Sequence, residues 1–365
     1  MNFDFATAAR ILFGAGQRGQ IAAAARAMGG RALLVTGRVS RLPSLDGVPF
    51  VVEGEPTVDL VARGVATARS EGCDMVIACG GGSAIDAGKA IAGLLTNPGD
   101  ILDYLEVVGR AQPMPNAAAP FIAVPTTAGT GSEVTRNAVL ASPAHGVKAS
   151  LRSPSMLPRL AVVDPELTLD LPPALTASTG MDALTQLIEP YVSVRANAMT
   201  DIFCVRGIAL CARSLRRAYT HGLDIEARTD MSMASLLGGL ALANAGLGAV
   251  HGFAAPIGGM FDAPHGAVCA ALLPHVTEAN LRHAGGDTLR RYEEVTRLLT
   301  GRDDGLAPWL AALTRDLGIA PLRTYGLAEK HVADVCAKAA AASSMKGNPV
   351  VLPVDELQAI LRAAR

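Results

Sequence analysis

The sequence has little charge and no paired cysteines. Only 18% of its 365 residues are charged and the net charge is −1, which argues against nucleic acid as the main partner. Its six cysteines form no CxxC pair, so we predict neither a zinc ribbon nor a disulfide framework. We interpret them as reduced thiols of the core, as expected for a cytoplasmic protein.

The sequence also lacks a long uninterrupted apolar run. Its most apolar stretch, LLGGLALANAGLGAVHG (236–252), contains glycine and asparagine and is shorter than the roughly 20 residues that a bilayer requires. We therefore predict a buried helix there and no membrane partner. The N-terminus, MNFDFATAARILFGAG, carries the acidic Asp4 and has no apolar core, so we expect no signal peptide.

The first part of the chain alternates β-rich runs with alanine-rich helical runs. Strands are predicted at 31–37, 47–54, 74–80 and 120–127, and helices at 56–72 and 83–97. This βαβ rhythm predicts an α/β domain with a parallel sheet and helices on both of its faces.

After AVVDPELTLDLPP (161–173) the strand signals stop, and helical periodicity continues to the end of the chain. Pro165, Pro172 and Pro173 mark the change. We predict an α/β domain at 1–164 and an all-α domain at 165–365. A cleft between two such domains is a usual place for a ligand.

A glycine-rich turn, ACGGGSAIDAGKAIA (78–92), joins a predicted strand to a helix. Its small residues allow phosphates to approach the backbone, and the free N–H groups at the helix start attract negative charge. The candidates for pyrophosphate binding are Gly80, Gly81, Gly82 and Ser83. A tight turn without a ligand is the alternative, because the GxGxxG fingerprint of the common dinucleotide fold is absent.

A second loop, VPTTAGTGSEVTRNAVL (124–140), places four threonines and two glycines directly after a strand. Hydroxyls and mobile backbone amides suit a phosphate, a ribose or a nicotinamide carboxamide. A purely structural loop would rarely need so many hydroxyls beside glycines, so this loop favours nucleotide binding.

Together the two loops resemble the iron-containing (group III) alcohol dehydrogenase family, a relative of maleylacetate reductase and of the dehydroquinate synthase-like superfamily. The resemblance continues in GMDALTQLIEPYVS (180–193), in VHGFAAPIGGMFDAPHGAVCAALLPHV (250–276) and in NP (348–349). It implies that the α/β domain binds NAD(P) and that the helical domain is catalytic. It also implies NAD(P)-dependent interconversion of alcohols with aldehydes or ketones. Family members usually hold Fe²⁺ or Zn²⁺ and are commonly oligomeric, so we expect a homo-oligomer, in the simplest case a dimer.

The resemblance implies further cofactor-binding positions beyond the glycine turn. They are Asp86, Thr126, Thr127, Thr130, Ser132, Asn137 and Lys148. The family often has an Asp after the first strand, where this chain has Gly37 with Arg38 and Arg41 nearby. Glycine does not repel a 2′-phosphate and an arginine can pair with it, which favours NADP(H) over NAD(H). The alternative interpretation is that Arg38 and Arg41 are surface charges with no role in cofactor binding.

The family's metal pattern is an Asp and a His four residues apart on one helix, followed by two later histidines. Here Asp182 is retained, but Gln186 replaces the His on the same helical face. In HGFAAP we assign the third ligand position to Ala255, and His251 to a cofactor-side histidine that does not bind metal. The fourth ligand is His265. With only Asp182 and His265 as donors, we expect the metal to be absent or weakly bound.

A carbonyl reductase without a metal needs another group to polarise the carbonyl and to donate a proton. A protonated histidine can do both. We predict a metal-independent reductase in which an Asp182–His265 pair is the general acid and His251 is the rival donor. The alternative for these histidines is that they only cap helix ends.

Other functions remain open at this point. One is a maleylacetate-reductase-like enzyme acting on an acidic keto substrate, although that family's loop patterns differ from TTAGTGSEVT and GMDA. Another is a dehydroquinate-synthase-like lyase, which needs an intact metal site and a cluster of basic residues. A third is a protein that binds the cofactor without catalysis.

Overall fold

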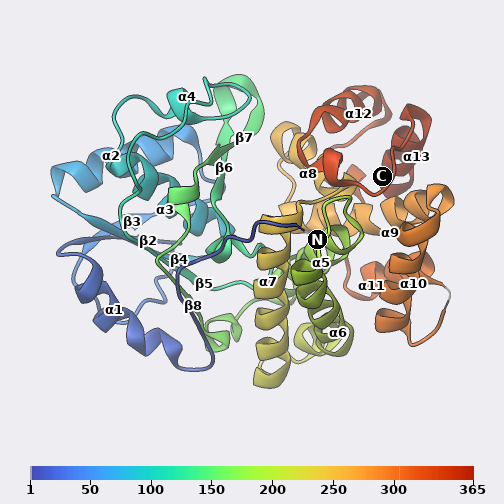
Figure 1. The fold of residues 1–365 in the computed structure, drawn as a ribbon, viewed down its shortest axis with the longest axis horizontal. Helices are drawn as coiled ribbons and strands as arrows, with labels where there is room; N and C mark the ends of the chain where they lie inside the picture. The colour runs from blue at the N-terminus through green and yellow to red at the C-terminus, as the bar shows by residue number, and fades with distance from the viewer. Residues whose placement is uncertain (1, 304) are drawn as a thin grey trace. The chain divides into compact units, whose positions relative to one another are not determined.

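The computed structural model describes residues 2–303 and 305–365, which form two compact units. The first consists of Ala6–Thr127 and Gly131–Leu169 and contains the sheet (Figure 1). The second consists of Ala128–Thr130, Asp170–Arg365 and the N-terminal segment through Phe5, and it is helical. The main division therefore falls between Leu169 and Asp170, near the boundary predicted from the proline cluster.

The sheet of the first unit is six-stranded and entirely parallel, with the order β1-β8-β5-β4-β2-β3. Its strands are β1 (Ile11–Phe13), β2 (Ala32–Thr36), β3 (Val48–Val51), β4 (Met75–Gly80), β5 (Phe121–Pro125) and β8 (Leu160–Val163). The four predicted strands are present, and the fold class is confirmed. Strands β1 and β8 were not predicted, because three or four residues are too short to show a pattern.

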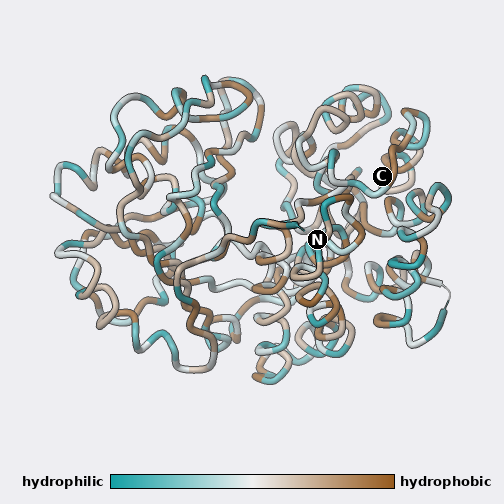
Figure 2. The backbone as a smooth tube through the Cα atoms, viewed as in Figure 1, coloured by the Kyte–Doolittle hydropathy of each residue, from teal (hydrophilic) through white to brown (hydrophobic). Residues whose placement is uncertain are grey.

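Helices cover both faces of this sheet. They are α1 (Ile21–Met28), α2 (Val58–Ser70), α3 (Gly82–Leu95) and the short α4 (Ile101–Tyr104). Side chains alternate along β4: Val76 and Ala78 lie in the core formed with α2 and α3, whereas Ile77 and Cys79 lie in the core formed with α1. Strands buried on both faces are continuously apolar, as the brown segments in Figure 2 show.

A two-stranded antiparallel hairpin accompanies the sheet. It pairs β6 (Asn137–Ser142) with β7 (Val147–Arg152). The sequence analysis did not predict these strands. The hairpin matters for function because β6 directly follows the threonine-rich loop and therefore helps to hold the end of that loop.

The second unit contains the long helices of the chain. They are α5 (Pro173–Val192), α6 (Ala198–Thr220), α7 (Ile225–Ala245), α8 (Ala249–Met260), α9 (His265–His283), α10 (Gly286–Thr300), α11 (Leu306–Asp316), α12 (Val332–Ala341) and α13 (Val354–Ala364). Helix α5 packs against α6, α7 and α9, and α8 packs against α9 and α12. This packing brings the middle of α5 and the starts of α8 and α9 together.

The apolar stretch 236–252 is not one helix. It contains the end of α7 and the start of α8, which are separated at Gly246 (φ 72°) and bent by 98°. Among the described residues, no single helix is long and apolar enough to cross a membrane, and only this bent pair meets the criteria of length and composition together.

Candidate active site

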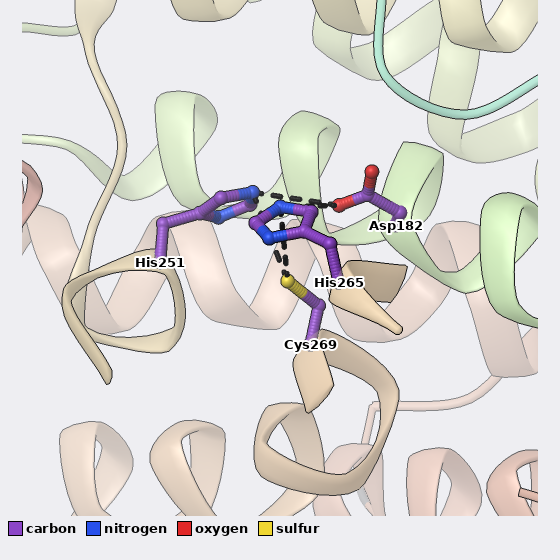
Figure 3. A group of neighbouring side chains, drawn as sticks. All are labelled: Asp182, His251, His265 and Cys269. Carbon is purple, nitrogen blue, oxygen red and sulfur yellow. Dashed lines mark hydrogen bonds and ion pairs between the residues drawn. The ribbon is translucent and has the colours of Figure 1, made fainter. Parts of the chain in front are cut away.

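Three helices of the second unit bring four candidate metal ligands together. Asp182 lies on α5, His251 in the first turn of α8, and His265 and Cys269 on α9. One ligand atom from each lies within 4.8 Å of the others. Figure 3 shows the four side chains pointing toward one another. His265 and Cys269 meet there because residues four apart share one face of a helix.

The start of α8 is held by side chains distant in sequence, because its N-cap residue, Gly248, has none. Glu189 Oε1 accepts a hydrogen bond from Val250 N at 2.7 Å, and Asn348 Oδ1 accepts one from Ala249 N at 3.1 Å. A Cβ at Gly248 would lie 2.9 Å from Glu189 Oε1, so a larger residue there would displace the Glu189 carboxylate. These contacts fix the direction in which His251 enters the site.

Glu189 also fixes the ring of His251. Its Oε2 lies 2.6 Å from His251 Nδ1, and both side chains are buried. The carboxylate of Glu189 therefore keeps a proton on Nδ1 of His251. The other ring nitrogen, Nε2, faces Asp182 Oδ1 at 3.4 Å. A carboxylate behind a histidine is the usual support of a metal-binding imidazole.

Asp182 presents one of its two carboxylate oxygens to the cluster. Gln186 Nε2 donates a hydrogen bond to Asp182 Oδ2 at 3.0 Å. Asp182 Oδ1 is buried without a hydrogen-bond partner in the described part of the chain. It lies 3.4 Å from His251 Nε2 and 3.7 Å from His265 Nε2. A buried carboxylate oxygen without a partner is costly, so the arrangement requires a positive charge at this point.

The pKa values of the site also indicate that a positive charge is favoured beside Asp182. Burial acts to raise the pKa of Asp182, but the two histidines lower it overall. The sulfur of Cys269 raises the pKa of His265 to about 9, against the effect of burial and with help from Asp182. Burial acts to lower the pKa of His251, but Cys269 and Glu189 raise it well above its usual value. The site therefore attracts either protons or a metal cation.

The donor set fits a divalent metal. Ligands of a tetrahedral zinc lie about 3.4 Å apart when both are nitrogen or oxygen, and about 3.6 Å apart when one is sulfur. The distances from Asp182 Oδ1 to the two imidazoles, 3.4 and 3.7 Å, and from Cys269 Sγ to the same imidazoles, 3.7 and 3.9 Å, are close to these values. Carboxylate, imidazole and thiolate are also the donors that zinc accepts.

The structure brings together a larger donor set than the sequence analysis predicted. His251, which was placed on the cofactor side, lies within the cluster, and Cys269 was not considered. Ala255 is exposed, one helical turn beyond His251, and carries no donor. Two signals were present: Cys269 follows His265 by four residues, and Glu189 follows Asp182 by seven on the same helical face.

In the first unit, the glycine turn and the threonine loop begin at neighbouring strand ends. Gly80 pairs with Pro125 in the sheet, and Thr126 N donates to Gly80 O at 2.9 Å. Helix α3 starts at Gly82, and its N-cap Gly81 provides no side-chain cap. A Cβ on Gly81 would lie 3.4 Å from Thr127 Cγ2, so the two loops are in contact. Backbone amides at such a helix start suit a phosphate.

A buried lysine connects the two loops. Lys89 is fully buried, and its Nζ donates to Ser132 O, Ser132 Oγ, Thr135 Oγ1 and Asn137 O at 2.7 to 2.9 Å. Asp86 accepts from Ser132 Oγ and, at 2.9 Å, from Val139 N. Three predicted cofactor residues, Asp86, Ser132 and Asn137, therefore hold the loop in place. Sequence analysis missed Lys89.

The residues proposed to select the cofactor lie after β2. A Cβ on Gly37 would meet no atom within 4 Å. Arg38 is exposed and pairs with Glu53 at 3.2 Å, whereas Arg41 donates to Leu167 O. Lys148 lies 3.2 Å from Glu55. Of the two arginines considered for pairing with a 2′-phosphate, Arg38 is therefore the one whose side chain is exposed beside Gly37.

A parallel α/β unit with two polar loops at one sheet edge and a helical unit with four candidate metal ligands are the arrangement expected for a two-domain dehydrogenase of this kind. Residues 8–165 match the family model "Iron-containing alcohol dehydrogenase". Residues 176–365 match "Fe-containing alcohol dehydrogenase family, C-terminal". The chain belongs to the iron-containing alcohol dehydrogenase family.

Individual relatives agree with this assignment. The chain is 39% identical to 1,3-propanediol dehydrogenase of Klebsiella pneumoniae over 323 residues, which are 86% of this chain and 81% of that protein. A solved 1,3-propanediol oxidoreductase has a TM-score of 0.92 and 34% identity, with 100% of both chains covered. Sulfoacetaldehyde reductase from Bifidobacterium kashiwanohense, solved with NAD⁺, has a TM-score of 0.89 and 30% identity, with 99% of this chain and 98% of that chain covered. The protein is an oxidoreductase acting on CH–OH groups.

Proposed function

We propose that this protein interconverts alcohols with aldehydes or ketones by hydride transfer with NAD(P), and that its helical unit holds a divalent metal. The observation that carries the second part is Asp182 Oδ1, a buried carboxylate oxygen without a hydrogen-bond partner in the described chain, which faces two imidazole nitrogens. Such an arrangement is stable only around a cation.

Asp182, His251 and His265 would hold the metal, with Cys269 beside them. A divalent metal in such a site supplies Lewis-acid polarisation of the substrate oxygen. The protein's own part is to orient the donors: Glu189 fixes the ring of His251, and Gln186 holds Asp182 by its other oxygen. Burial of Asp182 and His251 keeps water from these groups.

The metal-independent mechanism predicted from the sequence is the alternative. Its supporting observation is the pKa of His265, which is raised to about 9 by Cys269 and Asp182, so that this imidazole is protonated at neutral pH. The His265 side chain is also 40% exposed and thus within reach of a substrate. A protonated histidine could polarise the carbonyl and donate the proton.

One experiment decides between these mechanisms. The untagged protein is analysed for metal and assayed for oxidation of NADPH and NADH with aldehydes and keto acids, with and without EDTA. Activity lost in EDTA and restored by Zn²⁺ or Fe²⁺ supports the metal enzyme. Activity that survives EDTA and disappears in His265→Ala supports the histidine acid. Cofactor binding without turnover on any substrate supports a binding protein.

For the cofactor we retain the proposed preference for NADP(H), which rests on Gly37 and the exposed Arg38. Gly37→Asp should repel the 2′-phosphate and shift the ratio of kcat/KM for NADPH over NADH toward NADH by about tenfold or more, equivalent to about 1.4 kcal/mol. Arg38→Ala should shift it less. Equal or better kcat/KM of the native protein with NADH contradicts the preference, and the related sulfoacetaldehyde reductase was solved with NAD⁺.

The substrate class is the remaining part of the proposal. The 1,3-propanediol dehydrogenase relatives favour a small alcohol or aldehyde, and the same screen tests the alternative, an acidic keto substrate of the maleylacetate-reductase kind. The proposed dimer is tested by light scattering of the purified protein.

A further inference from the structure

We propose that Cys269 is a metal ligand, and that its thiolate replaces the histidine that the family has at the position of Gln186. This inference rests on the proposed function only in that it requires a metal to bind. It concerns which atoms bind the metal and is independent of substrate and cofactor.

The first argument is the position of the sulfur. Cys269 is fully buried, and its Sγ lies 3.7 Å from His265 Nε2 and 3.9 Å from His251 Nε2. Figure 3 shows dashed lines from the sulfur to the imidazole nitrogens. The two distances lie at the long end of hydrogen bonds to sulfur, and they also suit two ligands of one cation.

The second argument is that the amide of Gln186 is a weak substitute for the histidine of the family. Its Nε2 donates to Asp182 Oδ2 at 3.0 Å, and the opposite orientation of the amide would place an oxygen against a carboxylate oxygen. The group that faces Asp182 is therefore an N–H donor, which cannot bind a metal. Gln186 Nε2 therefore positions Asp182, whereas Gln186 Oε1 is buried without a hydrogen-bond partner in the described chain. A neutral amide oxygen is a poorer donor for Zn²⁺ than a thiolate, so Cys269 is the stronger candidate for the fourth ligand.

The third argument is the excess of acceptor atoms in the cluster. Glu189 accepts the Nδ1 proton of His251, so in the neutral imidazole Nε2 is an acceptor that faces Cys269 Sγ. Asp182 Oδ1 is buried and has no hydrogen-bond partner in the described chain. A carboxylate oxygen, an imidazole lone pair and a thiolate that faced one another would repel unless a proton or a metal cation lay among them. Thiolate ligands favour Zn²⁺ over harder cations, so we expect Zn²⁺ to be the metal that the purified protein retains.

The test uses the full-length protein with its native metal replaced by Co²⁺. Thiolate ligation gives Co²⁺ an intense near-ultraviolet charge-transfer band, which nitrogen and oxygen ligands do not. We expect the band in the native protein, its loss in Cys269→Ala, and its retention in Cys211→Ala, a matched removal of a buried cysteine in α6. In competition with a chelator, Cys269→Ala should bind Zn²⁺ at least about tenfold more weakly.

A second variant provides a rescue. Adding Gln186→His to Cys269→Ala restores an imidazole at the family's position, and we expect recovery of Zn²⁺ affinity without recovery of the band. Native protein that binds Co²⁺ without the band overturns the inference and leaves the metal-dependent function intact. A band that persists in Cys269→Ala also overturns it. Native protein that binds neither Co²⁺ nor Zn²⁺ overturns both proposals.

Discussion

Each unit of this protein buries a polar cluster, and the two clusters differ in whether their atoms satisfy one another. In the α/β unit, Lys89 Nζ meets four acceptors at 2.7 to 2.9 Å. In the helical unit, Asp182 Oδ1 has no hydrogen-bond partner in the described chain, and its nearest histidine nitrogen is 3.4 Å away.

The difference distinguishes a structural cluster from a site built for a ligand. Burial lowers the pKa of Lys89, yet its bonds to the threonine loop and the nearby Asp86 compensate for the lost hydration. That cluster is complete without any further group. The helical cluster lacks a positive charge, and the protein must obtain one from a proton or a metal.

The largest effect is expected for Asp182→Asn, which keeps the shape of the side chain and removes its charge. Bound metal should fall from about one per chain to background, and kcat/KM should fall by more than the 10–100-fold that is usual for loss of an outer partner. Metal analysis and steady-state kinetics measure this. The control is Asp201→Asn, which breaks an ion pair with Arg291 in the same unit and should retain the metal. Full metal content in Asp182→Asn would exclude the carboxylate as a ligand.

The next effect concerns stability. Lys89→Met leaves Asp86 and the loop acceptors without their buried cation, and we expect a loss of about 3–5 kcal/mol in the free energy of unfolding, measured by denaturant titration. Metal content should not change. The control is Arg31→Met, which removes an ion pair with Glu71 between half-exposed side chains and should cost less than about 1 kcal/mol. Equal stability of the two variants would show that the lysine cluster is not structural.

The smallest effect is expected for Glu189→Gln, which retains a side chain of the same shape behind His251. Loss of the carboxylate should weaken metal affinity about 10–100-fold while the fold is maintained. Competition with a chelator measures the affinity, and circular dichroism checks the fold. Glu294→Gln, at a position that accepts a hydrogen bond from Tyr191, is the matched control. Unchanged affinity in Glu189→Gln would mean that the buried carboxylate only caps α8.

The α/β unit was largely predictable because its signals are local. Strand β4, the glycine turn and helix α3 follow one another in sequence, and so do β5 and the threonine loop. Adjacent parallel strands then bring the two loops to one edge. Among the parts that were missed, β1 and β8 are apolar but only three and four residues long, and β6 and β7 alternate buried with partly exposed positions.

The candidate metal ligands were only partly predictable, because they come from helices that are distant in sequence. Asp182 and Gln186 could be placed on one face of a helix from their spacing alone. The role of His251 could not, because it depends on Glu189, 62 residues earlier in the chain. A family pattern indicated which residue types to expect, but it did not show which of two neighbouring positions, 251 or 255, faces the other donors.

The sequence by itself determined the two-part architecture, because periodicity and glycine-rich turns act over a few neighbouring residues, and its motifs carried the resemblance to the family. Only the tertiary structure decided that His251 and Cys269 join Asp182 and His265. The physical reason is that α9 packs against both α5 and α8, which brings side chains of α8 and α9 next to the buried carboxylate of Asp182 on α5.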